Sequence, residues 1–192
     1  TLPIGAQPAG QTCLDNNAPA TVGSSDAAGV HVSCAARPKY AYVANSGGGT
    51  VLQYTIGATG ALEPMRSPAV AAGKVPRSVA VSPSGLYAYV TNYGSGTVSQ
   101  FTIGADGALA PMDAPPVPAG TNPISIAVDP SGKYVYVTNG GSGSVSQYAI
   151  GAGGALAPIG KRGLLAGNTP IFIAIDPSDE HTHVVNKGDN KV

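Results

Sequence analysis

The chain has 192 residues with equal numbers of acidic and basic side chains, and only 10% of its residues are charged, while glycine and proline are abundant. The zero net charge, without a basic stripe or an acidic tail, argues against a nucleic-acid partner and against a strongly cationic one. No apolar run approaches the roughly 18 residues of a membrane-spanning helix, so we expect no membrane span.

Residues 1–29 form the first segment, and they differ in pattern from everything that follows. The segment contains Cys13, and the only other cysteine of the chain, Cys34, lies shortly after it. The two cysteines do not form a Cys-x-x-Cys motif, so neither a redox pair nor a haem-attachment site is indicated. We interpret residues 1–29 as an N-terminal arm or as the end of a preceding module.

The same segment resembles the closing part of small β-sandwich modules in large secreted bacterial proteins. Those modules read Gly-x-Gln-Pro-x-Gly-Gln-x-Cys, then a turn, then Val-x-Val-x-Cys, and the matching stretches here are residues 5–13 and 30–34. The resemblance implies a disulfide between Cys13 and Cys34, which in turn favours an extracellular, cell-surface or periplasmic location.

From residue 30 onward the sequence repeats itself with a period of about 47 residues, within the range typical of repeat architectures. The phrase Tyr-Val-Thr-Asn or a near-copy of it recurs at this period without insertions. Its final asparagines are Asn45, Asn92, Asn139 and Asn186. We place the repeats near residues 30–75, 76–122, 123–169 and 170–192, the last of them incomplete.

Each repeat reads as four short strands, and residues 76–122 show the order. Residues 78–81 alternate and end in a Pro-Ser-Gly turn, and residues 87–92 are aromatic and β-branched. Residues 97–103 alternate again and end near Asp106-Gly107, a tight-turn dipeptide. The proline-broken stretch after it suits an outer edge strand.

Four strands per unit of 40–50 residues is typical of a β-propeller blade. The sequence therefore predicts an all-β fold, a β-propeller of about three and a half to four blades within residues 30–192. Blades stack face to face, so we expect Val79 and Val81 to face one neighbouring blade and Ala80 the other. The positions one repeat later, Ile126 and Val128, should pack as Val79 and Val81 do.

The repeats resemble the YVTN-type β-propeller repeats of bacterial and archaeal surface or secreted proteins. They are similar, more distantly, to lactonase-type seven-bladed propellers. The resemblance implies the fold, but not a single function, because the same blade serves enzymes, binding modules and spacers.

The length of the chain leaves the number of blades in the ring undecided. Seven blades need about 330 residues at this period, so one interpretation is a fragment of a larger propeller. The alternative is a four-bladed ring in which residues 1–7 supply an outer strand. A related alternative takes residues 30–35 as the first strand of the first blade, with Cys34 tying the arm to the propeller. Open terminal blades would also permit self-association.

Few residues of the sequence suggest catalysis or metal binding. His181 and His183 lie on one face of a predicted strand and could hold a metal ion with nearby carboxylates. The plainer interpretation is that they replace Tyr134 and Tyr136 of the preceding repeat at a half-exposed position, and we expect no cofactor.

Other polar positions recur in every copy and therefore favour structural roles. We expect Asp129 and Asp176, which replace Ser82, to cap the Pro-Ser turn through a side-chain hydrogen bond. The four repeated asparagines should serve at the exit of the second strand. The charged residues that a hydrolase would need match no motif and are scattered: Glu63, Arg66, Arg77, Arg162 and Glu180.

The sequence thus favours a secreted or cell-surface binding module with an unidentified protein, glycan or small-molecule ligand, and it leans against an enzyme. The alternative is a lactonase-type hydrolase that opens a cyclic ester, with catalytic residues partly outside this chain. Its only support at this stage is the resemblance to the lactonase-type propellers.

Overall fold

The computed structural model describes residues 39–160, 163–178 and 181–188. The chain divides into the units Thr1–Arg37 and Pro38–Val192, and every described element belongs to the second. The disulfide predicted between Cys13 and Cys34, and the strand predicted at residues 30–35, lie outside the described residues.

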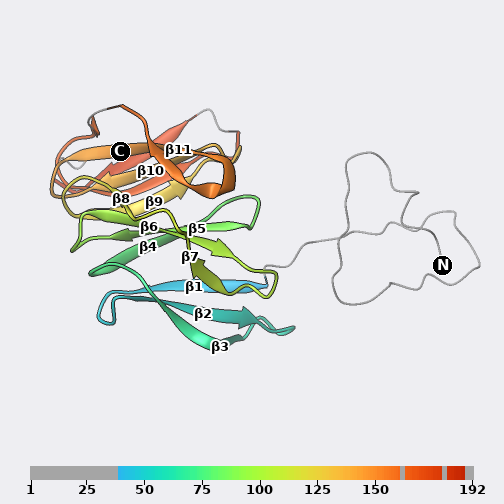
Figure 1. The fold of residues 1–192 in the computed structure, drawn as a ribbon. Coiled ribbons are helices and arrows are strands. Elements are labelled where there is room, and N and C mark those ends of the chain that lie inside the picture. Colours follow the sequence, from blue (N-terminus) through green and yellow to red (C-terminus); the bar gives the residue numbers. More distant parts are fainter. Residues whose placement is uncertain (1–38, 161–162, 179–180, 189–192) are drawn as a thin grey trace, which may run out of the picture. The chain divides into compact units, whose positions relative to one another are not determined.

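The second unit is a stack of antiparallel sheets, one for each sequence repeat (Figure 1). In Figure 1 the first sheet is blue to green at one end of the stack, and the last sheet is red at the other. The described part of the first sheet has three strands in the order β1-β2-β3. Their bounds are Tyr40–Asn45, Thr50–Ile56 and Leu62–Ala71.

The second and third sheets repeat one arrangement. The bounds of β4 to β8 are Pro76–Val81, Tyr87–Asn92, Thr97–Ile103, Leu109–Pro111 and Val117–Pro118. The bounds of β9 to β13 are Pro123–Val128, Tyr134–Asn139, Ser144–Ile150, Leu156–Pro158 and Leu164–Leu165, with a short 3-10 turn, η1, at Ala152–Gly154. The fourth sheet contains β14 (Pro170–Ile175) and β15 (Thr182–Asn186).

These sheets confirm the predicted all-β fold, a partial β-propeller, and no α-helix occurs among the described residues. The outer strand, which was predicted to be short and broken by prolines, is indeed interrupted. The outer strand of the second and third blades is split into two pieces that both pair with the third strand, β7 and β8 with β6, and β12 and β13 with β11. In the second blade the break spans two consecutive prolines, Pro115 and Pro116, which cannot donate to a ladder.

No described helix is long and apolar enough to cross a membrane.

Two hydrophobic clusters join consecutive blades. One cluster, between the first and second blades, contains Val51, Val90 and Phe101, with Val79 packed against it. The other cluster, between the second and third blades, is larger, and its members are Tyr89, Val98, Ile126, Val135, Val137, Tyr148 and Leu156, with Ala80 and Val128 packed against it. The alternation predicted for the first strand is therefore confirmed for Val79, Ala80, Ile126 and Val128, whereas Val81 is exposed.

Within the described ranges, the innermost strand of the second and third blades pairs only with the second strand. Each innermost strand also carries a bulge at its second residue, so that Pro76 pairs with Asn92 while Ser78 pairs with Thr91, and Arg77 is left over. The third and fourth blades have the same irregularity, which leaves over Ile124 and Ile171. A bulge bends the strand and changes the direction of the extra residue.

At the far end of the innermost strand, Asp129 caps the Pro-Ser turn as predicted. Its carboxylate accepts a 2.6 Å hydrogen bond from the Tyr134 N–H and a second from the Ser131 hydroxyl. Asp176 accepts a 2.9 Å bond from the Ser178 hydroxyl. In the second blade Ser82 takes this place and accepts from the Tyr87 N–H at 3.1 Å.

Candidate functional site

One end of every blade gathers two kinds of loop: the connection from the outer strand to the innermost strand of the next blade, and the hairpin between the second and third strands. We call it the connection end. Its described loops are residues 46–49, 72–75, 93–96, 119–122, 140–143, 166–169 and 187–188. Backbone hydrogen bonds join the two kinds of loop, for example from Tyr93 N to Val75 O at 3.0 Å and from Gly94 N to Lys74 O at 2.9 Å.

A functional site in a repeat protein should break the repeat, because a substrate is bound once and not once per blade. At the connection end the second blade does this. Lys74, Arg77 and Tyr93 stand where the third blade has Thr121, Ile124 and Gly140. The fourth blade has Asn168, Ile171 and Lys187 at these positions. The second blade thus combines two cationic side chains and an aromatic ring at this end.

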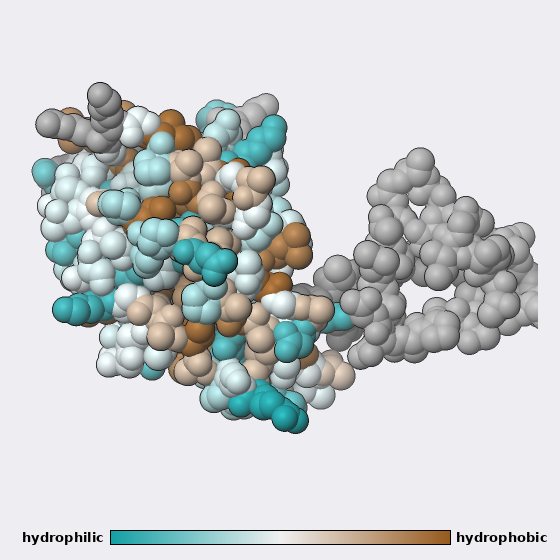
Figure 2. All heavy atoms as spheres, in the orientation of Figure 1, coloured by the Kyte–Doolittle hydropathy of each residue, from teal (hydrophilic) through white to brown (hydrophobic). Residues whose placement is uncertain are grey.

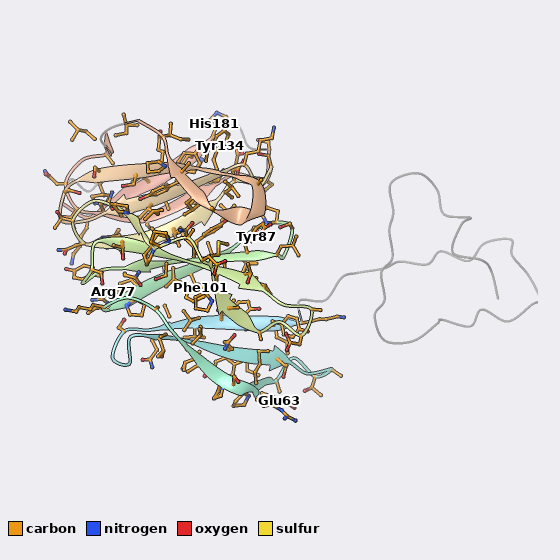
Figure 3. All side chains as sticks on the ribbon, in the orientation of Figure 1. Glu63, Arg77, Tyr87, Phe101, Tyr134 and His181 are labelled. Carbon is orange, nitrogen blue, oxygen red and sulfur yellow. The ribbon has the colours of Figure 1, made fainter. Side chains whose placement is uncertain are left out.

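Arg77 is the extra residue of the bulge in β4, and its side chain is exposed. Its guanidinium carbon lies 5.0 Å from the centre of the Tyr93 ring, within the range of a cation–π contact. In the third blade the corresponding positions are filled without charge, and a Cβ added to Gly140 would lie 2.5 Å from the Ile124 side chain. Figure 3 shows Arg77 near one edge of the stack, with Tyr87 towards the opposite edge.

The loop that precedes Arg77 is strained. Val75 has a φ of 52°, in the left-handed region that a β-branched residue rarely adopts. The same position in the next two connections is Asn122 at 54° and Thr169 at 53°. Such conformations cost on the order of 1–3 kcal/mol, and because all three connections share this one, the strain belongs to the blade architecture and does not mark the second blade. The surrounding hydrogen bonds, including one of 2.8 Å from Lys74 N to the Ser95 hydroxyl, hold the strained backbone in place.

The chemistry of this end is that of an anion or oxyanion site. Arg77 and Lys74 are exposed cations, and a guanidinium suits planar oxygen pairs of carboxylates and phosphates. The described loops of the connection end contain no carboxylate and no histidine. The described loops of this end could therefore hold an anionic group, but they supply no side chain that could act as a general base.

The predicted metal pair, His181 and His183, lies at the end of the blades opposite to the connection end. The two rings stack with their centres 6.4 Å apart. His181 Nδ1 lies 3.0 Å from an Asp176 carboxylate oxygen, and both histidines are exposed. Within the described part of the chain, no group of three histidine, cysteine or acidic side chains is arranged to hold a metal ion.

The repeated asparagines lie at equivalent positions in their blades. Two of them make the same three hydrogen bonds, and we call this set the staple because it links the preceding connection loop to the third strand. Asn92 accepts a 3.0 Å bond from Gly73 N and donates to the Thr97 and Ser99 hydroxyls at 3.0 and 2.9 Å. Asn139 makes the same set with Gly120, Ser144 and Ser146. Asn45 makes only longer bonds of 3.4 Å, and the buried Asn186 Oδ1 has no partner among the described residues.

The remaining charged residues do not gather with Arg77. Glu63 and Arg66 are exposed on the outer strand β3, and Arg162 and Glu180 lie outside the described residues. Figure 2 agrees, because strongly hydrophilic residues are scattered over the displayed face and do not form one patch. Sequence analysis named Arg77 but missed Lys74 and Tyr93. A position-by-position comparison of the repeats would have found them, since they break the pattern.

Comparison with known proteins agrees with the fold. The sequence model of the family described as "Lactonase, 7-bladed beta-propeller" matches residues 6–192. No curated protein matches the chain.

Solved structures of similar fold include a putative 6-phosphogluconolactonase from Bacteroides fragilis, with 26% identity and a TM-score of 0.61 over 70% of this chain and 38% of that one. A putative 6-phosphogluconolactonase from Bacteroides uniformis has 20% identity and a TM-score of 0.67 over 79% of this chain and 48% of that one. The periplasmic gluconolactonase of Pseudomonas aeruginosa has 23% identity and a TM-score of 0.64 over 78% and 44%. The chain therefore spans less than half the length of each of these proteins.

Proposed function

Since the chain belongs to the lactonase family of seven-bladed β-propellers, we propose that it is part of a hydrolase that opens a cyclic ester. The family match over residues 6–192 is the observation that carries the proposal. It reverses the preference drawn from composition, because neither the family nor its structural neighbours favour a plain binding module over an enzyme. The inclination against an enzyme has no support in these comparisons.

The reaction adds water to the ester carbonyl carbon and then breaks the bond between that carbon and the ring oxygen. The ring oxygen takes a proton and becomes a hydroxyl, and the new carboxylic acid releases a proton at neutral pH. Negative charge develops on the carbonyl oxygen as water adds, so a fixed cation beside that oxygen lowers the barrier.

Arg77 is our candidate for this role. The bulge in β4 sets the direction in which the Arg77 side chain leaves the strand, and the cation–π contact with Tyr93 holds its guanidinium. The positive charge is therefore oriented before a substrate binds. Lys74, three residues away on the strained connection, can hold a second oxygen of the substrate. The base that activates water is assigned to other blades of the ring.

The test is lactone hydrolysis by the full-length polypeptide, assayed on five- and six-membered lactones with and without an anionic substituent. The informative variant is Arg77→Ile, because isoleucine stands at this position in the next two blades. We expect a loss of about 100-fold in kcat/KM, the typical effect of removing one oxyanion-stabilising group. The matched control is Arg66→Ile, which removes an exposed arginine from β3 and should leave activity unchanged. Absence of ring opening on the whole panel, or full activity of Arg77→Ile, would reject the proposal.

We further propose that the protein works outside the cytoplasm, with Cys13 joined to Cys34. The support is the resemblance of the N-terminal segment to secreted β-sandwich modules. Closing a loop of about 20 residues would contribute roughly 3 kcal/mol in the chain-entropy model. Mass spectrometry without reductant should find the linked cysteines in material from the native host, and two alkylatable thiols in that material would argue against the assignment.

A further inference from the structure

The third blade departs from the other repeats at the residue that follows its repeated asparagine. Asn139 precedes Gly140, and this is the only Asn-Gly pair of the chain. The other three repeated asparagines precede larger residues, which are Ser46, Tyr93 and Lys187. Glycine has no side chain to crowd its backbone nitrogen, and its backbone bends freely. An Asn-Gly pair therefore favours attack of that nitrogen on the asparagine side chain.

This attack leads to deamidation of the asparagine. The Gly140 nitrogen gives up its proton and bonds to Cγ of Asn139, the bond between Cγ and Nδ2 breaks, and Nδ2 takes up a proton and leaves as ammonia. A succinimide ring remains. Water then opens either carbonyl–nitrogen bond of the ring, which gives aspartate or isoaspartate. The net change consumes water and releases ammonia, so no other reactant is needed.

In the folded chain, hydrogen bonds engage both reacting groups. Gly140 N donates a 2.9 Å bond to Asn122 O, and Asn139 Oδ1 accepts a 3.0 Å bond from Gly120 N. Both bonds join the end of β10 and its hairpin to the preceding connection loop. The Gly140 nitrogen must leave Asn122 before it can attack, so the hairpin and the loop must separate first.

The leaving group is held as well. Asn139 Nδ2 donates to the Ser146 hydroxyl at 2.9 Å and to the Ser144 hydroxyl at 3.2 Å. Asn139 is 0% exposed, so bulk water does not reach its amide. The staple therefore opposes both the attack on Cγ and the departure of ammonia.

We propose that Asn139–Gly140 is a modification site that deamidates only when the connection end of the third blade opens. Aspartate and isoaspartate at this position then accumulate with the time that this end spends open. The second blade has the same staple at Asn92 but lacks the reactive pair, because Tyr93 follows. The proposal does not depend on the proposed lactone hydrolysis.

The product prevents the staple from closing again. Aspartate places a charge at a fully buried position, which is costly. Isoaspartate adds a methylene carbon to the main chain, and this shifts Gly140 away from Asn122 and disturbs the pairing of residue 139 with Ser144. Because the ammonia is lost, the change is permanent, and the converted chain keeps a weakened connection end.

The experiment follows each repeated asparagine of the full-length polypeptide by peptide mass spectrometry during incubation at mildly alkaline pH. One sample is native and the other is unfolded in guanidinium chloride. In the unfolded sample Asn139 should convert at least about tenfold faster than the other three asparagines. In the native sample Asn139 should convert at least about tenfold more slowly than in the unfolded one, because local opening must come first. The converted fraction, separated by charge, should have a lower Tm.

Two variants distinguish local opening from unfolding of the whole chain. Ser146→Ala removes the shorter bond of the leaving nitrogen, and it should raise the native rate at Asn139 about fivefold while the rate in the unfolded chain stays unchanged. The matched control is Ser99→Ala, which removes the equivalent bond at Asn92. It should change the native rate at Asn139 by less than about twofold, because the two sites lie in different blades.

A further variant tests the role of the glycine. A Cβ on Gly140 would lie 2.5 Å from Ile124, so Gly140→Tyr is combined with Ile124→Arg to copy the second blade. Conversion of Asn139 in the unfolded chain should then fall at least about tenfold. Three results would overturn the proposal. They are equal rates at Asn139 in native and unfolded chains, equal acceleration by Ser146→Ala and Ser99→Ala, and an unchanged Tm of the converted fraction.

Discussion

The backbone N–H of Leu156 donates a 2.7 Å hydrogen bond to the side-chain oxygen of Gln100, although the two residues belong to different blades. Both residues are almost fully buried, and the same bond joins Leu109 to Gln53 one blade earlier. The contact couples the third strand of one blade to the outer strand of the next. It therefore fixes how far each blade is rotated and shifted relative to its neighbour.

Gln100→Ala should destabilise the chain strongly. The change leaves Leu156 N and Pro115 O without their partner, and an unsatisfied buried group costs about 1–3 kcal/mol. We expect a loss of about 2–4 kcal/mol in the free energy of unfolding, measured by urea denaturation. Thr102→Ala is the matched control on the same strand, because Thr102 is exposed and its bond to Ala110 O is long at 3.3 Å; it should change the value by less than about 0.5 kcal/mol. Equal losses in the two variants would contradict the role of the inter-blade bond.

Gly154→Ala should be costly while Gly60→Ala is tolerated. Both glycines have positive φ, 85° and 86°, so a new Cβ strains both to a similar degree. A Cβ on Gly154 would in addition lie 2.3 Å from the Tyr87 ring, whereas at Gly60 nothing lies within 4 Å. Thermal unfolding should show a loss of about 1–2 kcal/mol for Gly60→Ala, the usual cost of a Cβ in the left-handed region, and about 2–4 kcal/mol for Gly154→Ala, because overpacking adds its own cost. The prediction fails if the two variants have the same Tm.

Asn92→Ala should remove the staple at the end of the second strand. The amide of Asn92 is fully buried and makes three hydrogen bonds, to Gly73, Thr97 and Ser99. We expect a loss of about 2–4 kcal/mol in the free energy of unfolding, since several buried groups lose partners at once. Asn45→Ala is the matched control, because its bonds are 3.4 Å long and the residue is only half-buried. It should cost no more than about 1 kcal/mol, and a larger loss at Asn45 than at Asn92 would refute the explanation.

Alkaline pH should weaken the contacts between blades. Burial, with smaller effects of Tyr40 and Asp106, raises the pKa of Tyr42 to about 12, and burial with Tyr87 raises the pKa of Tyr89 as well. An unfolded tyrosine has a pKa of about 10. The stability that these tyrosines contribute is therefore complete below pH 10 and is lost as the pH rises from about 10 through 12, because the unfolded chain releases its protons first.

Denaturant titrations at fixed pH values from 7 to 12 test this point. The free energy of unfolding should change little from these two tyrosines between pH 7 and 9 and fall increasingly above pH 10. Tyr42→Phe loses the hydrogen bond to Gly107 O and should cost about 1 kcal/mol at pH 8. It should also reduce the fall between pH 10 and 12, and a fall of unchanged size in Tyr42→Phe would show that other groups cause it.

Local patterns in the sequence were sufficient for the strands and turns. The innermost strand begins at the proline that the repeat marks, as β4 does at Pro76, and the second strand ends at the repeated asparagine, as β5 does at Asn92. The turn at Asp129 was predictable because an aspartate two residues before a serine, next to a proline, hydrogen-bonds within its own loop. Alternation of side chains likewise predicted that Val79 and Ala80 face different neighbours.

The contacts between blades, and the set of side chains that meet at the connection end, could be known only from the tertiary structure. The bond from Leu156 to Gln100 joins residues 56 positions apart, and no local propensity encodes such a pairing. In the sequence, Arg77 was one of several scattered charged residues. In the structure, the bulge in β4 and the Tyr93 ring of the adjacent hairpin orient its guanidinium. Strand periodicity is a property of a few consecutive residues, and the sequence alone could determine it. A candidate site, by contrast, depends on which loops meet at one end of the stack, and only the packing of the blades settles that.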